Sequence, residues 1–309
     1  MYYFIVNEHS GRGRAVKEWR YVKQEMQAAK IPFSAWTTRG AGDATVLAQR
    51  VCELPEADKK LIVVGGDGTI NEVLNGMSDF EHVCLGVIPV GSGNDFARGL
   101  GISRQPREAM RQIYEASGDK RIDLGKVSVD GGEKHRFGIS AGVGLDAKVC
   151  ERVDASTQKS ALNSVGLGSL AYGLMTLSVV ANMEWAEGTV ELTKPDGVEA
   201  FVFDKLLFLS AMNFPWEGGG VPIAPDASGS DGLLSVCMAS GLSKPLAFMR
   251  LPKLVKGHHY GVRGINHAEA IKAEVKVGAP LVVHADGEIL GYGTDICFEI
   301  MPQILRVLI

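Results

Sequence analysis

Two glycine-rich stretches with embedded aspartates are the part of this chain best suited to chemistry. The first reads Gly-Gly-Asp-Gly-Thr over 65–69 and follows an apolar run at 61–64. The second reads Gly-Ser-Gly-Asn-Asp over 91–95 and follows another apolar run at 84–87. Glycines let a backbone approach an anion closely, and the N-terminus of a following helix adds a positive dipole end. A bare phosphate cradle has no use for a carboxylate, so Asp67 indicates a nucleotide site where a metal or a proton takes part in the reaction.

The simpler interpretation of either loop is a glycine-rich turn that carries a solvated aspartate. Two such loops favour the functional interpretation, because the strands of an open α/β sheet bind ligands at their carboxyl ends. The sequence has no Gly-x-x-x-x-Gly-Lys-Ser/Thr motif, so the phosphates need another cradle. We assign nucleotide contacts to Gly65, Gly66, Asp67, Gly68 and Thr69 in the first loop and to Gly91, Ser92, Gly93 and Asn94 in the second.

The elements that must position these loops alternate between strand and helix over residues 1–124. Besides the two apolar runs, we expect strands at 2–7 and 33–37 and helices at 14–29, 43–53 and 70–76. Asp43 is predicted to cap the second of these helices. This alternation predicts an N-terminal three-layer α/β nucleotide-binding domain with a parallel sheet.

Residues 125–300 are predicted to form an antiparallel β-rich, sandwich-like domain, because short apolar strands follow one another through Gly, Asp and Pro turns. The predicted strands lie at 127–130, 135–140, 189–193, 201–210, 233–238, 273–277, 281–284 and 296–300. Two helices are expected, at 162–181 and 245–256. The apolar tail at 301–309 is expected to add a strand or short element to one of the domains, with the first domain as the candidate.

Composition excludes several classes of protein. The 309 residues carry a formal net charge of −4 and a pI near 6.0, which argues against a nucleic-acid partner. Five scattered cysteines without a Cys-x-x-Cys pair fit reduced thiols in a cytoplasmic protein. The seven histidines show no ligand spacing, so no zinc site is predicted. The start of the chain reads as a strand without a basic region, so no signal peptide is predicted.

Two segments raise the question of membrane contact. Residues 160–183 carry no charge, but glycine and polar residues interrupt them, which favours a buried or interfacial helix over a spanning one. The segment at 245–256 places Arg250, Lys253 and Lys256 on one side of a helix and apolar residues on the other. Such a helix suits an anionic membrane surface, and the alternative is an ordinary surface helix packed on the β-rich domain.

Taken in order, the motifs resemble the diacylglycerol kinase catalytic-domain family, in the form of soluble bacterial lipid kinases. The matching segments are I-V-N-E-H-S-G-R-G at 5–13, G-G-D-G-T-I-N-E-V-L-N-G at 65–76, G-V-I-P-V-G-S-G-N-D-F-A-R at 86–98, I-D-L-G-K-V at 122–127, G-I-S-A-G-V-G-L-D-A at 138–147, P-D-A-S-G-S-D-G-L-L-S-V at 225–236 and H-A-D-G-E at 284–288. NAD kinases and phosphofructokinase-like enzymes share the first glycine loop. Asn71-Glu72 after it and the second loop make the match specific.

The resemblance implies an ATP site that also includes the first polar turn. Its residues would be Asn7, Ser10, Gly11, Arg12 and Gly13, with Arg14 nearby. The alternative for the two arginines is a solvated turn. The family usually has a proline after the asparagine, and this chain has Glu8 there.

The resemblance also implies how the acceptor hydroxyl loses its proton. Glu288 is the candidate general base and Asp67 is the second candidate. A carboxylate is a feeble base at neutral pH, so partial desolvation would help either of them. The alternative is that Asp286 and Glu288 are only acids of a hairpin turn.

A magnesium site is the third feature that the resemblance implies. The expected metal set is Asp231, Leu233 and Asp123, with Asp123 as a water-mediated partner to the nucleotide and Asp226 as the extra carboxylate. Carboxylates and water suit Mg²⁺. The family often has a second acid directly before Asp231, and this chain has Ser230.

We therefore expect an ATP- and Mg²⁺-dependent lipid kinase of phospholipid metabolism, converting diacylglycerol to phosphatidic acid. The alternatives are a kinase of another lipid of the sphingoid or acylglycerol type, an NAD kinase-like enzyme of a soluble metabolite, and a non-catalytic nucleotide-binding regulator. The expected location is the cytoplasm, with peripheral contact to the inner face of the membrane where the lipid lies. The sequence leaves the oligomeric state open, a homodimer included.

Overall fold

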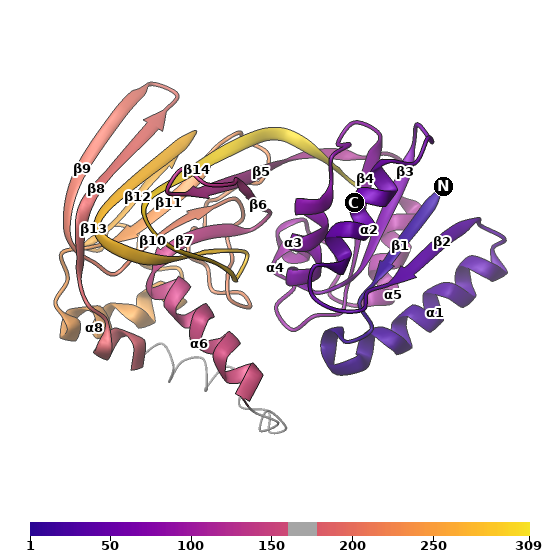
Figure 1. The fold of residues 1–309 in the computed structure, drawn as a ribbon, viewed down its shortest axis with the longest axis horizontal. Helices are drawn as coiled ribbons and strands as arrows, with labels where there is room; N and C mark the ends of the chain where they lie inside the picture. Colours follow the sequence, from indigo (N-terminus) through magenta and orange to yellow (C-terminus); the bar gives the residue numbers. More distant parts are fainter. Residues whose placement is uncertain (160–177) are drawn as a thin grey trace.

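The computed structural model describes residues 1–159 and 178–309 and has an α/β half and a β-rich half (Figure 1). The α/β half contains β1 (Tyr2–Val6), η1 (Ser10–Gly13), α1 (Arg14–Ala28), β2 (Phe33–Thr37), α2 (Asp43–Cys52), β3 (Lys59–Gly65), α3 (Asp67–Gly76), β4 (Val83–Pro89), α4 (Asp95–Gly99) and α5 (Pro106–Glu115). The β-rich half contains the elements that follow, and its antiparallel pairing agrees with the predicted fold class.

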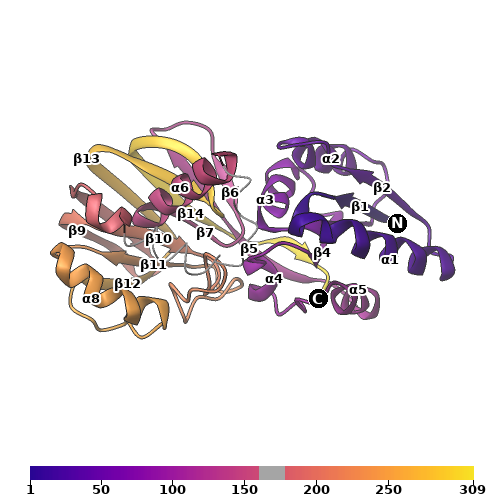
Figure 2. The same cartoon turned by 90° about the horizontal axis from the view of Figure 1, so that it is seen from below.

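The sheet of the α/β half is parallel, in the order β2-β1-β3-β4. Alternate side chains of β1 explain its two covered faces. Phe4 and Val6 pack in one cluster with α1 and α5, whereas Tyr3 and Ile5 pack in another with α2 and α3. Figure 2 shows α2 and α3 on one side of the strands and α1 and α5 on the other. Three layers therefore form, and all the carboxyl ends of the strands point to one edge.

The β-rich half is built from long antiparallel strands with helices on one side. Its elements are β5 (Lys120–Val129), β6 (His135–Phe137), β7 (Ser140–Gly144), α6 (Leu145–Lys159), β8 (Ala186–Lys194), β9 (Gly197–Leu206), β10 (Phe208–Met212), β11 (Leu234–Ala239), α8 (Lys244–Val255), β12 (Ile265–Ala270), β13 (Lys272–Ala285) and β14 (Glu288–Val307). The strands enclose one apolar core, and α6 and α8 cover a second core against β10 and β11.

One strand ties the two halves together. β14 first pairs with β13 and β5 in antiparallel fashion, and near its end Arg306 and Val307 pair in parallel with β4. A register shift between Met301 and Leu305 marks the change of partner. In Figure 1 this strand runs from the β-rich half into the α/β half, where the C-terminus lies. A single sheet therefore runs through both halves of the molecule.

Several predicted boundaries were wrong. The predicted strand at 201–210 is two strands, because Lys205 adopts a left-handed φ of +51° and the Leu207 N–H donates to the Ala239 carbonyl. The predicted strands at 273–277 and 281–284 form the single strand β13 with an irregularity between them. Asp43 is the first helical residue of α2 and Gly42 occupies the cap position.

Other elements were not anticipated from the sequence. The segment at 135–140 divides into β6 and β7, and α5, α6 and β12 have no counterpart among the predicted elements. Most of the helix predicted at 162–181 lies outside the described residues, and its last part, from 178, is helical. Among the helices that the structure describes, none is both long enough and apolar enough to cross a membrane.

Candidate active site

A cleft of about 660 Å³ opens at the carboxyl edge of the parallel strands. Five segments that lie far apart in sequence line it, and its volume suits a ligand of nucleotide size. The lining residues are Asn7, His9, Ser10, Gly11, Thr38, Gly40, Ala41, Gly66, Asp67, Gly68, Thr69, Glu72, Gly91, Ser92, Gly93, Asp286, Gly287 and Glu288. The first polar turn, both glycine loops and the late acidic turn therefore meet at one place.

The glycines of the cleft are needed because backbone packs against backbone. A Cβ atom on Gly91 would lie 2.7 Å from the Cα atom of Gly66. Gly11 has a left-handed φ of +61°, and a Cβ atom there would lie 2.0 Å from the Val90 carbonyl oxygen. Side chains at these positions would force the three segments apart. The cleft thus presents a surface made largely of main chain, which suits phosphate groups.

Asp67 stands at the start of α3, directly below the second glycine loop. Its Oδ1 atom accepts a hydrogen bond of 3.2 Å from the Phe96 N–H, and a Cβ atom on Gly93 would lie 2.8 Å from its Oδ2 atom. Burial raises the pKa of Asp67, although the Phe96 hydrogen bond and the nearby Arg98 charge oppose that shift. A carboxylate with a raised pKa is a stronger base than one in water.

Glu288 reaches the first glycine loop from the other half of the molecule. It is the first residue of β14, and its Oε1 atom would lie 2.8 Å from a Cβ atom on Gly68. The side chain is exposed to solvent at the cleft. Asp67 and Glu288 therefore contact the two glycine loops of one cleft from opposite halves of the molecule.

Asp286 has a structural role that the sequence did not reveal. Its carboxylate accepts hydrogen bonds from three successive backbone groups at the start of β7, the N–H groups of Gly138, Ile139 and Ser140, at 2.8, 2.8 and 3.1 Å. A fourth, of 2.9 Å, comes from the Asn71 side-chain amide. The available signal was Asn71 directly after the first glycine loop. Asn71 links the two halves of the molecule, because its hydrogen bond to Asp286 helps to fix the turn that precedes Glu288.

Glu72 also has a structural role, because it fixes one wall of the cleft. Its two carboxylate oxygens accept the N–H groups of Gly42 and Ala44 at 2.9 and 3.0 Å, at the N-terminus of α2. This bond holds the segment after β2, whose Thr38, Gly40 and Ala41 line the cleft. Sequence reasoning missed that segment, although the carboxyl end of β2 belongs to the same sheet edge.

The other residues assigned to the nucleotide lie at or behind the cleft wall. Gly65 is buried beneath Thr69, and Asn94, with a φ of +53°, closes the second loop by donating to the Gly91 carbonyl at 2.9 Å. Arg12 and Arg14 are exposed, and neither they nor Gly13 contribute to the lining. Their assignment to phosphate contact stays a prediction.

The residues assigned to magnesium lie away from the cleft lining. Asp123 is fully buried, and its two oxygens accept the N–H groups of Gly232 and Gln303 at 2.8 and 2.6 Å. Asp231 accepts the Leu233 N–H at 3.0 Å, and burial, together with nearby acids, raises its pKa. This arrangement ties the turn at 231–233 to β5, and its metal role remains a prediction.

Within residues 1–159 and 178–309, one group of three side chains has the donor spacing that a metal ion needs. It consists of Asp146, Glu217 and His284, whose donor atoms lie within 4.8 Å of one another. None of the three lines the nucleotide-sized cleft. The sequence had indicated no metal role for any histidine.

Comparison with known proteins now bears on the site. Residues 1–127 match the model of the diacylglycerol kinase catalytic domain, and residues 139–309 match that of the YegS C-terminal NAD kinase beta sandwich-like domain. The diacylglycerol kinase of Bacillus subtilis (strain 168) is 32% identical, over 92% of this chain and 88% of that protein. The diacylglycerol kinase of Staphylococcus carnosus (strain TM300) is 28% identical, over 92% of this chain and 87% of that protein.

A solved structure shares the fold. The crystal structure of a diacylglycerol kinase from Bacillus anthracis str. Sterne superposes with a TM-score of 0.70, covering 99% of this chain and 96% of that one, at 20% identity. The chain belongs to the diacylglycerol kinase family of lipid kinases. Membership of a kinase family implies the use of ATP.

Proposed function

We propose that this protein transfers the γ-phosphate of ATP to a lipid hydroxyl, with diacylglycerol as the acceptor and phosphatidic acid as the product. The observation that carries the proposal is a cleft of nucleotide size in which Asp67 packs against the second glycine loop and Glu288, from the β-rich half, packs against the first. The family supplies the reaction class, and the cleft supplies residues in suitable positions for each role.

The nucleotide is proposed to bind with its phosphates against the main chain of the two glycine loops. Phosphoryl transfer needs positioning and charge stabilisation more than covalent chemistry from the protein. The start of α3 at Asp67 supplies a positive dipole end, and the absence of a Cβ at Gly66 and Gly91 lets the two loops pack main chain against main chain. The two glycine loops thus provide a cradle without the lysine of a P-loop.

Charge balance supports a role for Mg²⁺. Among the described residues, the cleft lining contains four carboxylates, and it contains no lysine or arginine. Those carboxylates belong to Asp67, Glu72, Asp286 and Glu288, of which Glu72 and Asp286 are committed to backbone N–H groups. Asp67, at the start of α3, is the residue that would hold Mg²⁺ with the phosphates, and the bound ion would supply charge neutralisation at the transferring phosphoryl group.

The acceptor hydroxyl is proposed to approach from the β-rich half. Its oxygen forms the new bond to the γ-phosphorus as the bond to the leaving ADP oxygen breaks, and its proton passes to a carboxylate. Glu288 lies on the acceptor side and Asp67 lies on the phosphate side of the loop. We assign the proton to Glu288 and phosphate alignment to Asp67, with the reverse assignment as the alternative.

Contact with the membrane is proposed to involve α8. Met249 and Val255 on this helix are 73% and 56% exposed, and Lys253 and Lys256 are exposed beside them. Arg250 is half-buried, so it contributes less to the surface than the sequence suggested. Exposed apolar groups next to lysines suit the interface of an anionic membrane. Peripheral docking there would bring the β-rich half to its lipid.

A direct assay tests the function. Labelled ATP with Mg²⁺ should transfer phosphate to diacylglycerol in mixed micelles, and the product should migrate as phosphatidic acid. A panel of sphingoid bases, monoacylglycerol and NAD should accept less. A labelled sphingoid or monoacylglycerol product would keep the reaction and change the lipid. Labelling of NAD alone would overturn the lipid-kinase proposal.

A further inference from the structure

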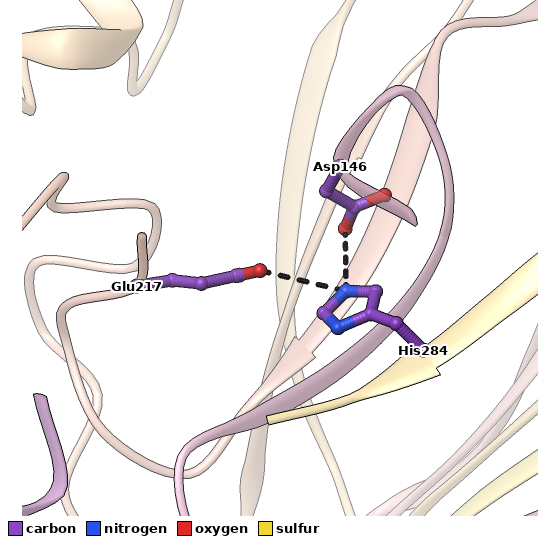
Figure 3. Close-up of side chains that lie close together, drawn as sticks. All are labelled: Asp146, Glu217 and His284. Atoms are coloured by element: carbon purple, nitrogen blue, oxygen red, sulfur yellow. Dashed lines mark hydrogen bonds and ion pairs between the residues drawn. The ribbon is translucent and has the colours of Figure 1, made fainter. Parts of the chain in front are cut away.

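His284 is buried between two carboxylates behind the turn that carries Glu288 (Figure 3). Its Nε2 atom lies 3.3 Å from Asp146 Oδ2 and 3.4 Å from Glu217 Oε1. The ring is fully buried, and the Asp146 and Glu217 side chains are only 15% and 14% exposed. Buried charges are normally paired, so this group needs a specific reason to exist.

The second ring nitrogen, Nδ1, shows that the group holds the turn at Gly287. The Gly287 N–H points at His284 Nδ1 over 3.3 Å, so Nδ1 accepts and carries no proton. The ring proton therefore sits on Nε2 and is directed at the two carboxylates. Gly287 is the middle of the turn from Asp286 to Glu288, where the chain adopts left-handed φ values of +50° and +89° at its first two residues. The histidine is thus a further partner of a turn that the hydrogen bonds of Asp286 also hold.

Asp146 is fixed as firmly as the ring. It lies at the start of α6, and its Oδ2 atom accepts a short hydrogen bond from the Ser210 hydroxyl on β10. A Cβ atom on Gly142 would lie 2.3 Å from this oxygen and 3.0 Å from His284 Nε2. Any side chain at position 142 would therefore push the carboxylate and the ring apart. Both groups are packed in place by β7.

Glu217 connects the group to the phosphate side of the cleft. It closes a turn with Val221 through backbone hydrogen bonds of 2.9 and 2.8 Å. Within that turn the Gly219 N–H donates to Asp95 Oδ2 at 2.6 Å, and Asp95 directly follows the second glycine loop. Contacts therefore run from that loop through Glu217 and His284 to the turn before Glu288. They join the two sides of the proposed reaction.

We propose that His284 is a positioning residue, whose Nδ1 atom holds the Gly287 N–H and so fixes Glu288 in the cleft, while Asp146 and Glu217 hold the ring. This inference rests on the proposed function for its catalytic consequence. It assigns no contact with substrate to His284. A displacement of about 1 Å of a catalytic group is enough to lower turnover by up to about a hundredfold.

The charges of the group determine where its extra proton lies. Burial raises the pKa of Glu217, the cationic form of His284 would lower it, and the charges of Asp146 and Asp286 raise it. The Ser140 hydroxyl adjoins this carboxyl and lowers its pKa, while Glu217 Oε2 has no hydrogen-bond partner among the described residues. Burial alone would lower the pKa of His284. The charges of Glu217, Asp146 and Asp286 outweigh this effect, so the pKa of His284 is raised. The two raised pKa values describe one proton that Glu217 and His284 share, and because the Gly287 N–H occupies Nδ1, that proton resides on Glu217.

Three variants of one residue test the positioning role. His284→Asn keeps an acceptor near the Nδ1 position, His284→Gln keeps a polar group near Nε2, and His284→Leu keeps neither. We expect kcat to fall by up to about a hundredfold in the Gln and Leu variants, to fall less in the Asn variant, and KM for ATP to stay constant. Equal losses in the Asn and Leu variants would overturn the inference.

Hydrogen exchange supplies a readout that needs no kinase activity. Amide exchange at Gly287 should be about fivefold faster in His284→Gln and His284→Leu than in wild type, the factor for one ordinary hydrogen bond. It should remain slow in His284→Asn. Unchanged exchange in all three would overturn the inference. If wild type phosphorylates no lipid while exchange follows this order, the proposed function fails and the structural assignment stands.

The pH profile and metal analysis complete the test. As Glu217 loses its proton at high pH, the group gains an additional buried negative charge beside the ring, so kcat of wild type should decline on the alkaline side. Glu217→Gln, which keeps the shape and removes the titration, should abolish that decline. Its persistence would overturn the proton assignment.

One equivalent of zinc or manganese in wild type, lost in His284→Asn, would overturn positioning in favour of a metal site.

Discussion

Lys59 in the α/β half pairs with Asp79 at 2.9 Å, whereas the β-rich half buries one imidazole against the carboxylates of Asp146 and Glu217. The lysine is 2% exposed and also donates to two backbone carbonyls, so its charge is matched and fully hydrogen-bonded. The group around His284 carries more negative than positive charge. Breaking the balanced pair of Lys59 and Asp79 would lower stability, whereas the unbalanced group around His284 binds a proton that it can release.

The two halves also divide the proposed reaction in different ways. The α/β half presents main chain, through glycine loops that are continuous in sequence. The β-rich half presents side chains whose positions depend on contacts between distant strands, such as Asp286 against β7. Phosphate binding is therefore built from local structure, whereas the acceptor side is built from tertiary contacts.

The largest effect is expected where the halves meet. Glu288→Gln should lower kcat by roughly 10²–10⁴-fold, and Asp67→Asn at least as much, with ATP affinity nearly unchanged, because each carboxylate acts during transfer. Single-turnover phosphoryl transfer and nucleotide binding would separate the two. Glu187→Gln, on the exposed face of β8, is the matched control and should behave as wild type. Full turnover in Glu288→Gln would move the base to Asp67.

The second effect tests the balanced pair. Asp79→Asn leaves Lys59 buried without its counter-charge, which should lower the free energy of unfolding by about 3–5 kcal/mol. Urea unfolding monitored by circular dichroism measures this loss. Glu115→Gln removes the partner of an exposed arginine on α5 and should change stability by less than about 1 kcal/mol. Similar losses in both variants would remove the distinction between buried and exposed pairs.

The same pair should give the α/β half an acid limit. Burial would raise the pKa of Asp79, but hydrogen bonds from the His82 N–H and from Lys59 outweigh it and lower it to about 2. A lowered pKa means that the stabilisation is present above the ordinary value of 3.8 and is lost as pH falls toward 2. The loss should be about 2 kcal/mol. Comparing wild type with Asp79→Asn between pH 5 and pH 2 should show the two curves converge. Parallel curves would exclude this linkage.

The smallest effect concerns membrane contact by the β-rich half alone. Reversal of Lys253 and Lys256 on α8 should weaken binding to anionic vesicles by about thirtyfold, at about 1 kcal/mol per charge. Reversal of Lys17 and Lys23 on α1 changes net charge equally in the other half and should have little effect. Vesicle sedimentation at low salt measures both. Equal loss in the two double variants would reflect net charge and not a docking face.

Local patterns accounted for much of the α/β half. Buried apolar runs at β3 and β4, followed by glycine loops and helices, predicted both the elements and the edge where the loops meet. These signals are local, because a parallel strand buried on both faces must be continuously apolar. The loop after β2 carries Gly40 and Gly42 but follows a strand that is not continuously apolar, so only the shared sheet edge reveals it.

The β-rich half was harder to predict because its strands change partner. β14 pairs first with β13 and β5 and then with β4, and an apolar run does not specify such an exchange. The break between β9 and β10 depends on a left-handed lysine, a conformation that composition does not indicate. The roles of Asn71 and Asp286 were equally hidden, since their bond spans 215 residues of sequence.

The sequence by itself determined which residues could do chemistry in this protein. Glycines that permit close backbone approach and carboxylates beside them are properties of residue type and local spacing. Only the tertiary structure decided that Asp286, which also lines the cleft, binds backbone N–H groups, while Glu288, two positions later, packs against Gly68 of the first glycine loop. It also brought Asp146, Glu217 and His284 together from three separate segments. Burial and neighbouring charge set the protonation of such a group, and both arise only when distant strands pack.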